Sequence, residues 1–200
     1  MYKLPRLAYL YQDLEPFIDT HTMALHYHKH MQNYLNNLND LLNKNYYDYR
    51  YSINELIYHI DEFNKSDKEN ILFNLGGVLN HDLYFKSISK NSFKPTGLLR
   101  KKINDTYGSY DNLLDKLEEE ALKLKGSGYT FLVCDTNKNL EIINMSNQDT
   151  PILYNKVPLL NIDLWEHAYY INYENDKKRY ITNFKQIIDF NNANNIYNNI

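Results

Sequence analysis

The 200-residue sequence contains a single cysteine, Cys134. No disulfide can form within the chain, which excludes a fold held together by disulfide bonds and is compatible with a reducing compartment. The sequence also lacks a run of 18 apolar residues, so we expect no transmembrane helix and no membrane partner. No continuous apolar stretch follows Met1, so we expect no secretory signal and a cytoplasmic location.

An excess of charge of one sign is also absent. The formal net charge is −3, so the overall charge does not favour nucleic acid or an anionic membrane as a partner. Apolar residues make up 43 % of the chain and charged residues 24 %, as in an ordinary globular protein that can bury a sizeable core. Tyrosine is abundant, with 20 residues, and we interpret the Asn-rich tail at 191–199 as a frayed end.

Helical periodicity dominates the first half of the chain. We expect an extended arm over residues 1–19 and a helix over 20–43. The apolar stripe of this helix consists of Tyr27, Met31, Leu35, Leu38 and Leu42. Ser52 followed by Glu55 fits a capping box and predicts a short helix, and residues 68–89 predict a further helix.

Two consecutive glycines, Gly76 and Gly77, lie in the middle of this last helix. Glycine in a helix interior costs roughly 1 kcal/mol relative to alanine. We therefore expect another backbone or a bulky group to approach the helix closely at this point.

The second half of the chain differs in character after a break at residues 95–97. Helical patterns at 97–106 and 111–125 precede β-type patterns, and helices return from about residue 175. The predicted strands are residues 129–135, 140–145 and 157–162. The predicted fold is α+β, with an N-terminal helical-hairpin domain over 1–92 and an α/β domain with a small three-stranded antiparallel sheet over 93–200.

Three segments contain residues that could bind a metal. His26, His30 and Tyr34 follow one another at four-residue spacing, so they line one side of the first helix. Ordinary half-exposed histidines would give the same pattern. His81 follows the glycine pair, although a lone histidine is more often structural than a ligand.

The third segment gives a stronger indication. Asp163 and His167 lie four residues apart directly after the apolar strand at 157–162, where both side chains can be aimed at one point. A carboxylate combined with imidazoles suits manganese, iron and other first-row ions. A salt-bridged pair at the surface would fit the spacing equally well.

Residues 163–170, which read D-L-W-E-H-A-Y-Y, resemble the signature of the iron/manganese superoxide dismutases. Further matching pieces occur in the order of that family, from Leu4-Pro5 to about Tyr180. They are Thr22-Met23 before His26, Lys29-His30, Tyr34, Gly76-Gly77, Asn80-His81, Tyr107-Gly108-Ser109, Gly126-Ser127-Gly128 and Asn147-Gln148-Asp149. So many ordered matches make a chance resemblance negligible.

The resemblance implies an enzyme that converts superoxide to dioxygen and hydrogen peroxide with one metal ion per subunit. The implied ligands are His26, His81, Asp163 and His167, with water or hydroxide as a fifth ligand. Tyr34 and Gln148 match residues that hydrogen-bond toward this solvent and tune the metal.

The resemblance also implies assembly into a homodimer or a tetramer. His30 and Tyr170 match a pair that meets across the dimer interface beside the substrate channel. Glu166 matches a residue that bonds the partner subunit's ligand histidine, and Trp165 matches an aromatic wall of the cavity. We also expect Lys29 and Lys177 to supply positive charge near the channel.

The chain departs from the family's usual pattern at three aromatic positions. Phe85, Tyr129 and Phe131 stand where tryptophans are common, so we expect an intact apolar wall with altered packing. Gln148 together with Gly77 matches the manganese-type arrangement, which iron-type members usually reverse. We therefore expect manganese as the preferred metal and iron as the second choice.

Three other interpretations fit parts of the sequence. Two histidines and a carboxylate could form a non-haem iron oxygenase site, although a third histidine would close one coordination position. A metal-binding relative without activity would not need Tyr34, Gln148, His30 and Glu166. Cys134 as a redox nucleophile is disfavoured, because its apolar strand predicts a buried, inert thiol.

Overall fold

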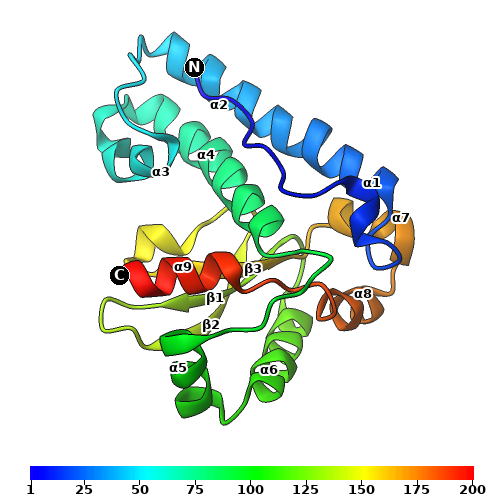
Figure 1. The fold of residues 1–200 in the computed structure, drawn as a ribbon. Coiled ribbons are helices and arrows are strands. Elements are labelled where there is room, and N and C mark those ends of the chain that lie inside the picture. The colour runs from blue at the N-terminus through cyan, green and yellow to red at the C-terminus, as the bar shows by residue number, and fades with distance from the viewer.

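A computed structural model describes residues 1–200 and contains a helical first half and a mixed second half (Figure 1). The first half contains η1 (Tyr11–Leu14), α1 (Thr20–Leu25), η2 (His26–Met31), α2 (Gln32–Lys44), α3 (Ile53–Leu56), η3 (Ile57–Glu62) and α4 (Lys65–Lys86). The second half contains α5 (Gly97–Tyr107), α6 (Tyr110–Lys123), β1 (Gly128–Cys134), β2 (Leu140–Ser146), η4 (Pro151–Tyr154), β3 (Val157–Asp163), η5 (Glu166–Ala168), α7 (Tyr170–Tyr173), α8 (Lys177–Phe184) and α9 (Asn191–Asn199).

The predicted first helix is one continuous rod made of α1, η2 and α2. Asp19 caps its start by accepting a hydrogen bond from the backbone N–H of Thr22 at 2.8 Å. Its middle segment, η2, is a π-helix, a wide turn that is rare and often found at functional sites. The predicted apolar stripe is buried, and α2 packs along α4 in the opposite direction, forming a hairpin (Figure 1).

The glycine pair in α4 has the expected close neighbours. A Cβ atom on Gly76 would lie 2.1 Å from the backbone oxygen of Gln148, and one on Gly77 would lie 2.5 Å from the ring of Tyr34. The prediction of a close approach is therefore confirmed. The glycines allow a loop of the second half and a side chain of α2 to reach the same stretch of α4.

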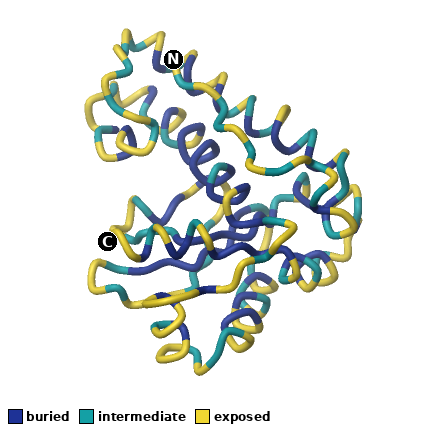
Figure 2. The backbone as a smooth tube through the Cα atoms, in the orientation of Figure 1, coloured by how far each residue is buried: buried dark blue, intermediate teal, exposed yellow.

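The three strands form an antiparallel sheet in the order β2-β1-β3. Every residue of the central strand β1 is buried, because α4 and α9 contact β3 while α5 and α6 contact β2 (Figure 2). The α+β fold class and the small three-stranded sheet are confirmed. No helix of this fold combines the length and apolar character that a membrane crossing requires.

Two further expectations concern single segments. Cys134 is buried in β1, and burial raises the pKa of its thiol to about 11, which confirms the expectation of an inert thiol. The expectation of a frayed tail is wrong. Residues 191–199 form α9, which packs on β3 with Ala193, Asn194 and Tyr197 buried, because one face of this Asn-rich helix carries enough apolar surface to cover the sheet.

Candidate metal centre

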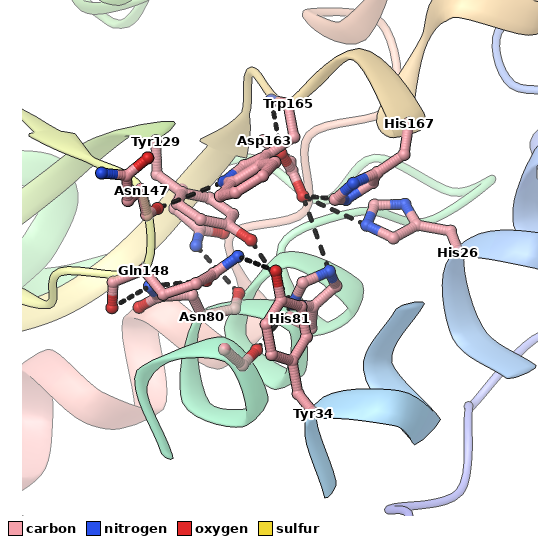
Figure 3. Close-up of polar contacts among 12 residues, drawn as sticks. His26, Tyr34, Asn80, His81, Tyr129, Asn147, Gln148, Asp163, Trp165 and His167 are labelled. Carbon is pink, nitrogen blue, oxygen red and sulfur yellow. Dashed lines mark hydrogen bonds and ion pairs between the residues drawn. The ribbon is translucent and has the colours of Figure 1, made fainter. Parts of the chain in front are cut away.

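Four side chains that are distant in the sequence converge in the interior of the molecule (Figure 3). His26 comes from the start of η2, His81 from α4, Asp163 from the end of β3 and His167 from η5. Their candidate ligand atoms all lie within 4.8 Å of one another. The structure thus brings together all four residues that the resemblance suggests as ligands.

The Asp163 carboxylate lies at the middle of this group. Its Oδ2 atom is 3.1 Å from His26 Nε2, 3.4 Å from His167 Nε2 and 3.9 Å from His81 Nε2. The other oxygen, Oδ1, accepts a hydrogen bond from the backbone N–H of Trp165 at 2.8 Å. This contact orients the carboxylate so that Oδ2 faces the three imidazoles.

The hydrogen bonds of His81 fix its tautomer. Its Nδ1 lies 2.6 Å from the backbone oxygen of Gly77, which can only accept, so Nδ1 carries the proton. The lone pair of Nε2 therefore faces the other candidate ligands. Nε2 of His81 and Nε2 of His167 are buried without a hydrogen-bond partner, although buried polar atoms rarely lack one. A first-row metal ion would satisfy both atoms, so the residues fit such a group.

Burial controls the charges in the pocket. It lowers the pKa of His26 and of His81, and it lowers the pKa of His30 to about 4 with the help of the neighbouring His167. Burial alone would raise the pKa of Asp163, but His167 and His26 hold it below its usual range. A neutral His26, a neutral His81 and an ionised Asp163 are the protonation states that metal binding requires.

Tyr34 and Gln148 form a linked pair beside these residues. Gln148 Nε2 donates to the Tyr34 hydroxyl at 3.0 Å, and the Tyr34 ring lies 5.3 Å from the His81 ring, centroid to centroid. Gln148 is buried although it lies in the loop between β2 and η4. The amide and the phenol thus sit where they can act on a molecule bound next to the four candidate ligands.

Sequence reasoning missed the residues that hold Gln148 in place. Asn80 Nδ2 donates to the backbone oxygens of Gln148 at 3.3 Å and of Asp149 at 3.1 Å. Asn161 Nδ2 in turn donates to the backbone oxygen of Asn80 at 2.9 Å. The sequence did contain one indication of this contact, because Asn161 is a polar residue inside an otherwise apolar strand.

Two further predicted residues contact the candidate ligands. The rings of His30 and His167 stack with centroids 4.0 Å apart, and Trp165 stacks on His167 at 5.6 Å.

Glu166 and Tyr170 lie at the surface, where 50 % of Tyr170 is exposed. Lys29 is also exposed, whereas the Lys177 ammonium donates to the backbone oxygen of Leu124 at 2.9 Å.

Two of the three aromatic substitutions, Phe85 and Tyr129, lie beside candidate ligands, and Phe131 packs behind Tyr129. Phe85 lies 5.0 Å from the His26 ring, centroid to centroid, and Phe131 lies 5.8 Å from the Tyr129 ring. All three side chains are buried, in agreement with the expected apolar wall. Sequence reasoning did not foresee that the Tyr129 hydroxyl would lie 3.3 Å from His81 Nδ1.

Three imidazoles and one carboxylate in a buried pocket define a candidate mononuclear metal centre, and the helical hairpin with a small sheet defines the scaffold. Comparison with known proteins then specifies the class. Residues 1–89 match the profile described as "Iron/manganese superoxide dismutases, alpha-hairpin domain". Residues 95–196 match a second profile, "Iron/manganese superoxide dismutases, C-terminal domain". The chain belongs to the iron/manganese superoxide dismutase family.

Curated relatives support this assignment over nearly the full length. "Superoxide dismutase [Mn] 2" of Bacillus cereus is 37 % identical over 198 residues, which cover 98 % of this chain and 94 % of the relative. The Bacillus anthracis protein of the same name has the same identity and coverage. "Superoxide dismutase [Mn]" of Thermus aquaticus is 36 % identical over 197 residues, which cover 98 % of this chain and 97 % of the relative.

Proposed function

We propose that this chain is a superoxide dismutase that holds one manganese ion per subunit through His26, His81, Asp163 and His167. The observation that carries the proposal is the convergence of these four candidate ligands within 4.8 Å in a family whose members dismute superoxide. When bound, the metal supplies a one-electron couple that accepts an electron from one superoxide and gives it to a second. The products are dioxygen and, with two protons, hydrogen peroxide.

Tyr34 would donate a proton beside the metal, and Gln148 would orient the Tyr34 hydroxyl. Burial raises the pKa of the Tyr34 phenol, so its hydroxyl keeps a proton that it can donate toward a small anion in the pocket. The Gln148 amide donates to the same hydroxyl and so directs the phenolic proton away from itself. The two residues would therefore place a proton donor where the peroxide product needs one.

His30, Trp165, Glu166 and Tyr170 would form the outer part of the site. The rings of His30 and Trp165 both stack on the His167 ring, with centroids 4.0 Å and 5.6 Å away, and restrict how this imidazole can turn. Glu166 and Tyr170 have surface positions that allow contact with a second subunit. We propose that a homodimer brings Glu166 to the partner's ligand histidine, whereas a tetramer remains a further prediction.

Manganese is the proposed metal because of the chain's own residues as well as its relatives. Gln148 reaches Tyr34 from the loop after β2, and Gly77 leaves the space in α4 that the Tyr34 ring occupies. The relatives named above carry manganese in their names. Iron would be the second choice, since similar donor sets accept either ion.

The proposal is tested by removing all metal, loading the protein separately with manganese and with iron, and measuring superoxide decay. Fast decay with manganese and slow decay with iron would support both the activity and the metal preference. Equal rates would support the activity and contradict the preference. No decay with either metal, despite one bound ion per subunit, would contradict the enzyme and favour an inactive metal-binding relative.

The domain boundary and the cellular location remain predictions from the sequence. We propose a division into two domains at residues 92 and 93, and a cytoplasmic location remains an expectation. Limited proteolysis tests the first and fractionation of the source cells tests the second.

A further inference from the structure

The Tyr129 hydroxyl lies in the metal pocket because of the register of the sheet. Tyr129 of β1 is directly opposite Asp163 of β3 in an antiparallel pair. Residues in this relation have side chains on the same face of the sheet and close together. Tyr129 is fully buried, so the register places a phenol inside the protein beside a candidate ligand carboxylate.

The contacts of Tyr129 show where its proton can go. Its hydroxyl is 3.3 Å from His81 Nδ1, but this nitrogen already directs its own proton to Gly77 at 2.6 Å. His81 Nδ1 therefore has no lone pair to accept a hydrogen bond from the phenol. The proton of Tyr129 needs another acceptor, and the Asp163 carboxylate and the Gln148 side chain are its other polar neighbours.

The Gln148 amide also lies within reach of the Tyr129 phenol. Its Nε2 atom donates to Tyr34 at 3.0 Å, and the side chain reaches between Tyr34 and Tyr129 (Figure 3). The amide group can donate one hydrogen to each hydroxyl, which leaves the Asp163 carboxylate as the acceptor for Tyr129. Burial raises the pKa of Tyr129 well above its ordinary value, so the proton stays on the phenol at neutral pH.

We propose that Tyr129 is a positioning residue that links the Gln148 amide to the Asp163 carboxylate and thereby sets the reduction potential of the bound metal. This inference rests on the metal centre proposed above. A hydrogen bond donated to a ligand carboxylate withdraws electron density from it, which disfavours the trivalent ion more than the divalent one. Removal of the hydroxyl should therefore lower the potential.

The test compares manganese-loaded wild type with Tyr129→Phe, which removes only the hydroxyl. Tyr107→Phe is the matched control, because Tyr107 is half-buried in α5, outside the group of pocket residues. The ratio of oxidised to reduced metal is measured by visible absorption at a series of applied potentials, together with metal content and melting temperature.

We expect Tyr129→Phe to keep one metal ion per subunit and to raise the oxidised-to-reduced ratio at least tenfold at a fixed potential, which equals a decrease of about 59 mV. Tyr107→Phe should leave the ratio unchanged. A ratio within threefold of wild type in metal-loaded Tyr129→Phe would overturn the inference.

A second variant covers the case in which Tyr129→Phe loses its metal or its fold. Incorporation of 3-fluorotyrosine at position 129 nearly preserves the shape and makes the phenol a stronger donor, so it should lower the oxidised-to-reduced ratio. An unchanged or increased ratio would overturn the inference. Active wild type with an unaltered ratio in both variants would refute only the role of Tyr129, whereas wild type that binds neither manganese nor iron would refute the metal centre as well.

Discussion

Asp163 is held from two directions at the centre of the pocket. The backbone N–H of Trp165 donates to its Oδ1 atom, and the Tyr180 hydroxyl donates to its backbone oxygen at 2.9 Å. Its remaining oxygen, Oδ2, faces the three imidazoles. The position of the carboxylate is therefore set before any metal binds, which reduces the entropy lost on binding.

Asp163→Asn tests how much the negative charge of the Asp163 carboxylate contributes to metal binding. The amide keeps the shape of the side chain but replaces a negative ligand with a neutral one, so we expect manganese affinity to fall by at least about tenfold. Asp189→Asn is the control, since Asp189 is a buried aspartate between α8 and α9 that does not belong to the four candidate ligands. Elemental analysis after dialysis against a weak chelator measures the loss. Equal metal content in the two variants would contradict the ligand role.

Gly77→Ala tests the close contact between α4 and Tyr34. Alanine is the better helix former by about 1 kcal/mol, so propensity alone predicts a more stable protein. The added Cβ would lie 2.5 Å from the Tyr34 ring, and the resulting overpacking should cost about 1–3 kcal/mol and lower the activity by displacing the phenol. Urea denaturation measures whether the free energy of unfolding rises, as propensity predicts, or falls, as overpacking predicts. Asn33→Ala on the exposed face of α2 should change little.

The metal-free protein should lose stability as the pH falls. The pKa of His30 is lowered from 6.5 to about 4, so the unfolded chain binds a proton there at a higher pH than the folded chain does. Stability that is present above pH 6.5 is then lost progressively between about pH 6.5 and pH 4. Because His30 is half-exposed, we reduce its share to about 1–2 kcal/mol. His30→Gln should flatten this part of the stability curve, measured by urea denaturation, and an unchanged curve would contradict the assignment.

At the scale of elements, the loop at residues 147–149 is attached to α4 by hydrogen bonds. Asn80 donates to two backbone oxygens of this loop, and Gly76 lets the loop approach α4. Asn80→Ala would leave buried acceptors without donors, at a cost of about 1–3 kcal/mol, and would release Gln148 from Tyr34. The matched control is Asn74→Ala on the same helix, because Asn74 bonds only within α4, to Asn70 at 2.8 Å. We expect activity and thermal stability to fall only in the Asn80 variant, and equal effects would argue against loop attachment.

Element-scale features also show what sequence reasoning could reach. The capping box at Ser52 and the glycine pair have local physical causes, and both predictions were confirmed. The π-helical turn at His26 has no local signature, since it depends on packing around the pocket. The roles of Asn161 and Tyr129 depend on strand register, which a single sequence does not provide. The convergence of the four candidate ligands was expected only through resemblance, because they come from four separate elements.

At the scale of the whole molecule, the C-terminal helix α9 attaches the end of the chain to the sheet. α9 covers β3, and Tyr197 exchanges two hydrogen bonds with Lys138 in the turn between β1 and β2. Deleting residues 191–200 should therefore destabilise the protein by at least about 3 kcal/mol, the typical loss for one buried aromatic side chain. Deleting only residues 199–200 is the control. A melting temperature unaffected by the longer deletion would restore the interpretation of a frayed tail.

The two halves of the molecule each contribute two of the four candidate ligands, so the metal centre joins them. The measurement that tests this most directly is anomalous diffraction at the manganese absorption edge from crystals of the manganese-loaded protein. We expect one anomalous peak per chain, within bonding distance of His26, His81, Asp163 and His167. A peak elsewhere, or a peak bonded to only part of this set, would contradict it.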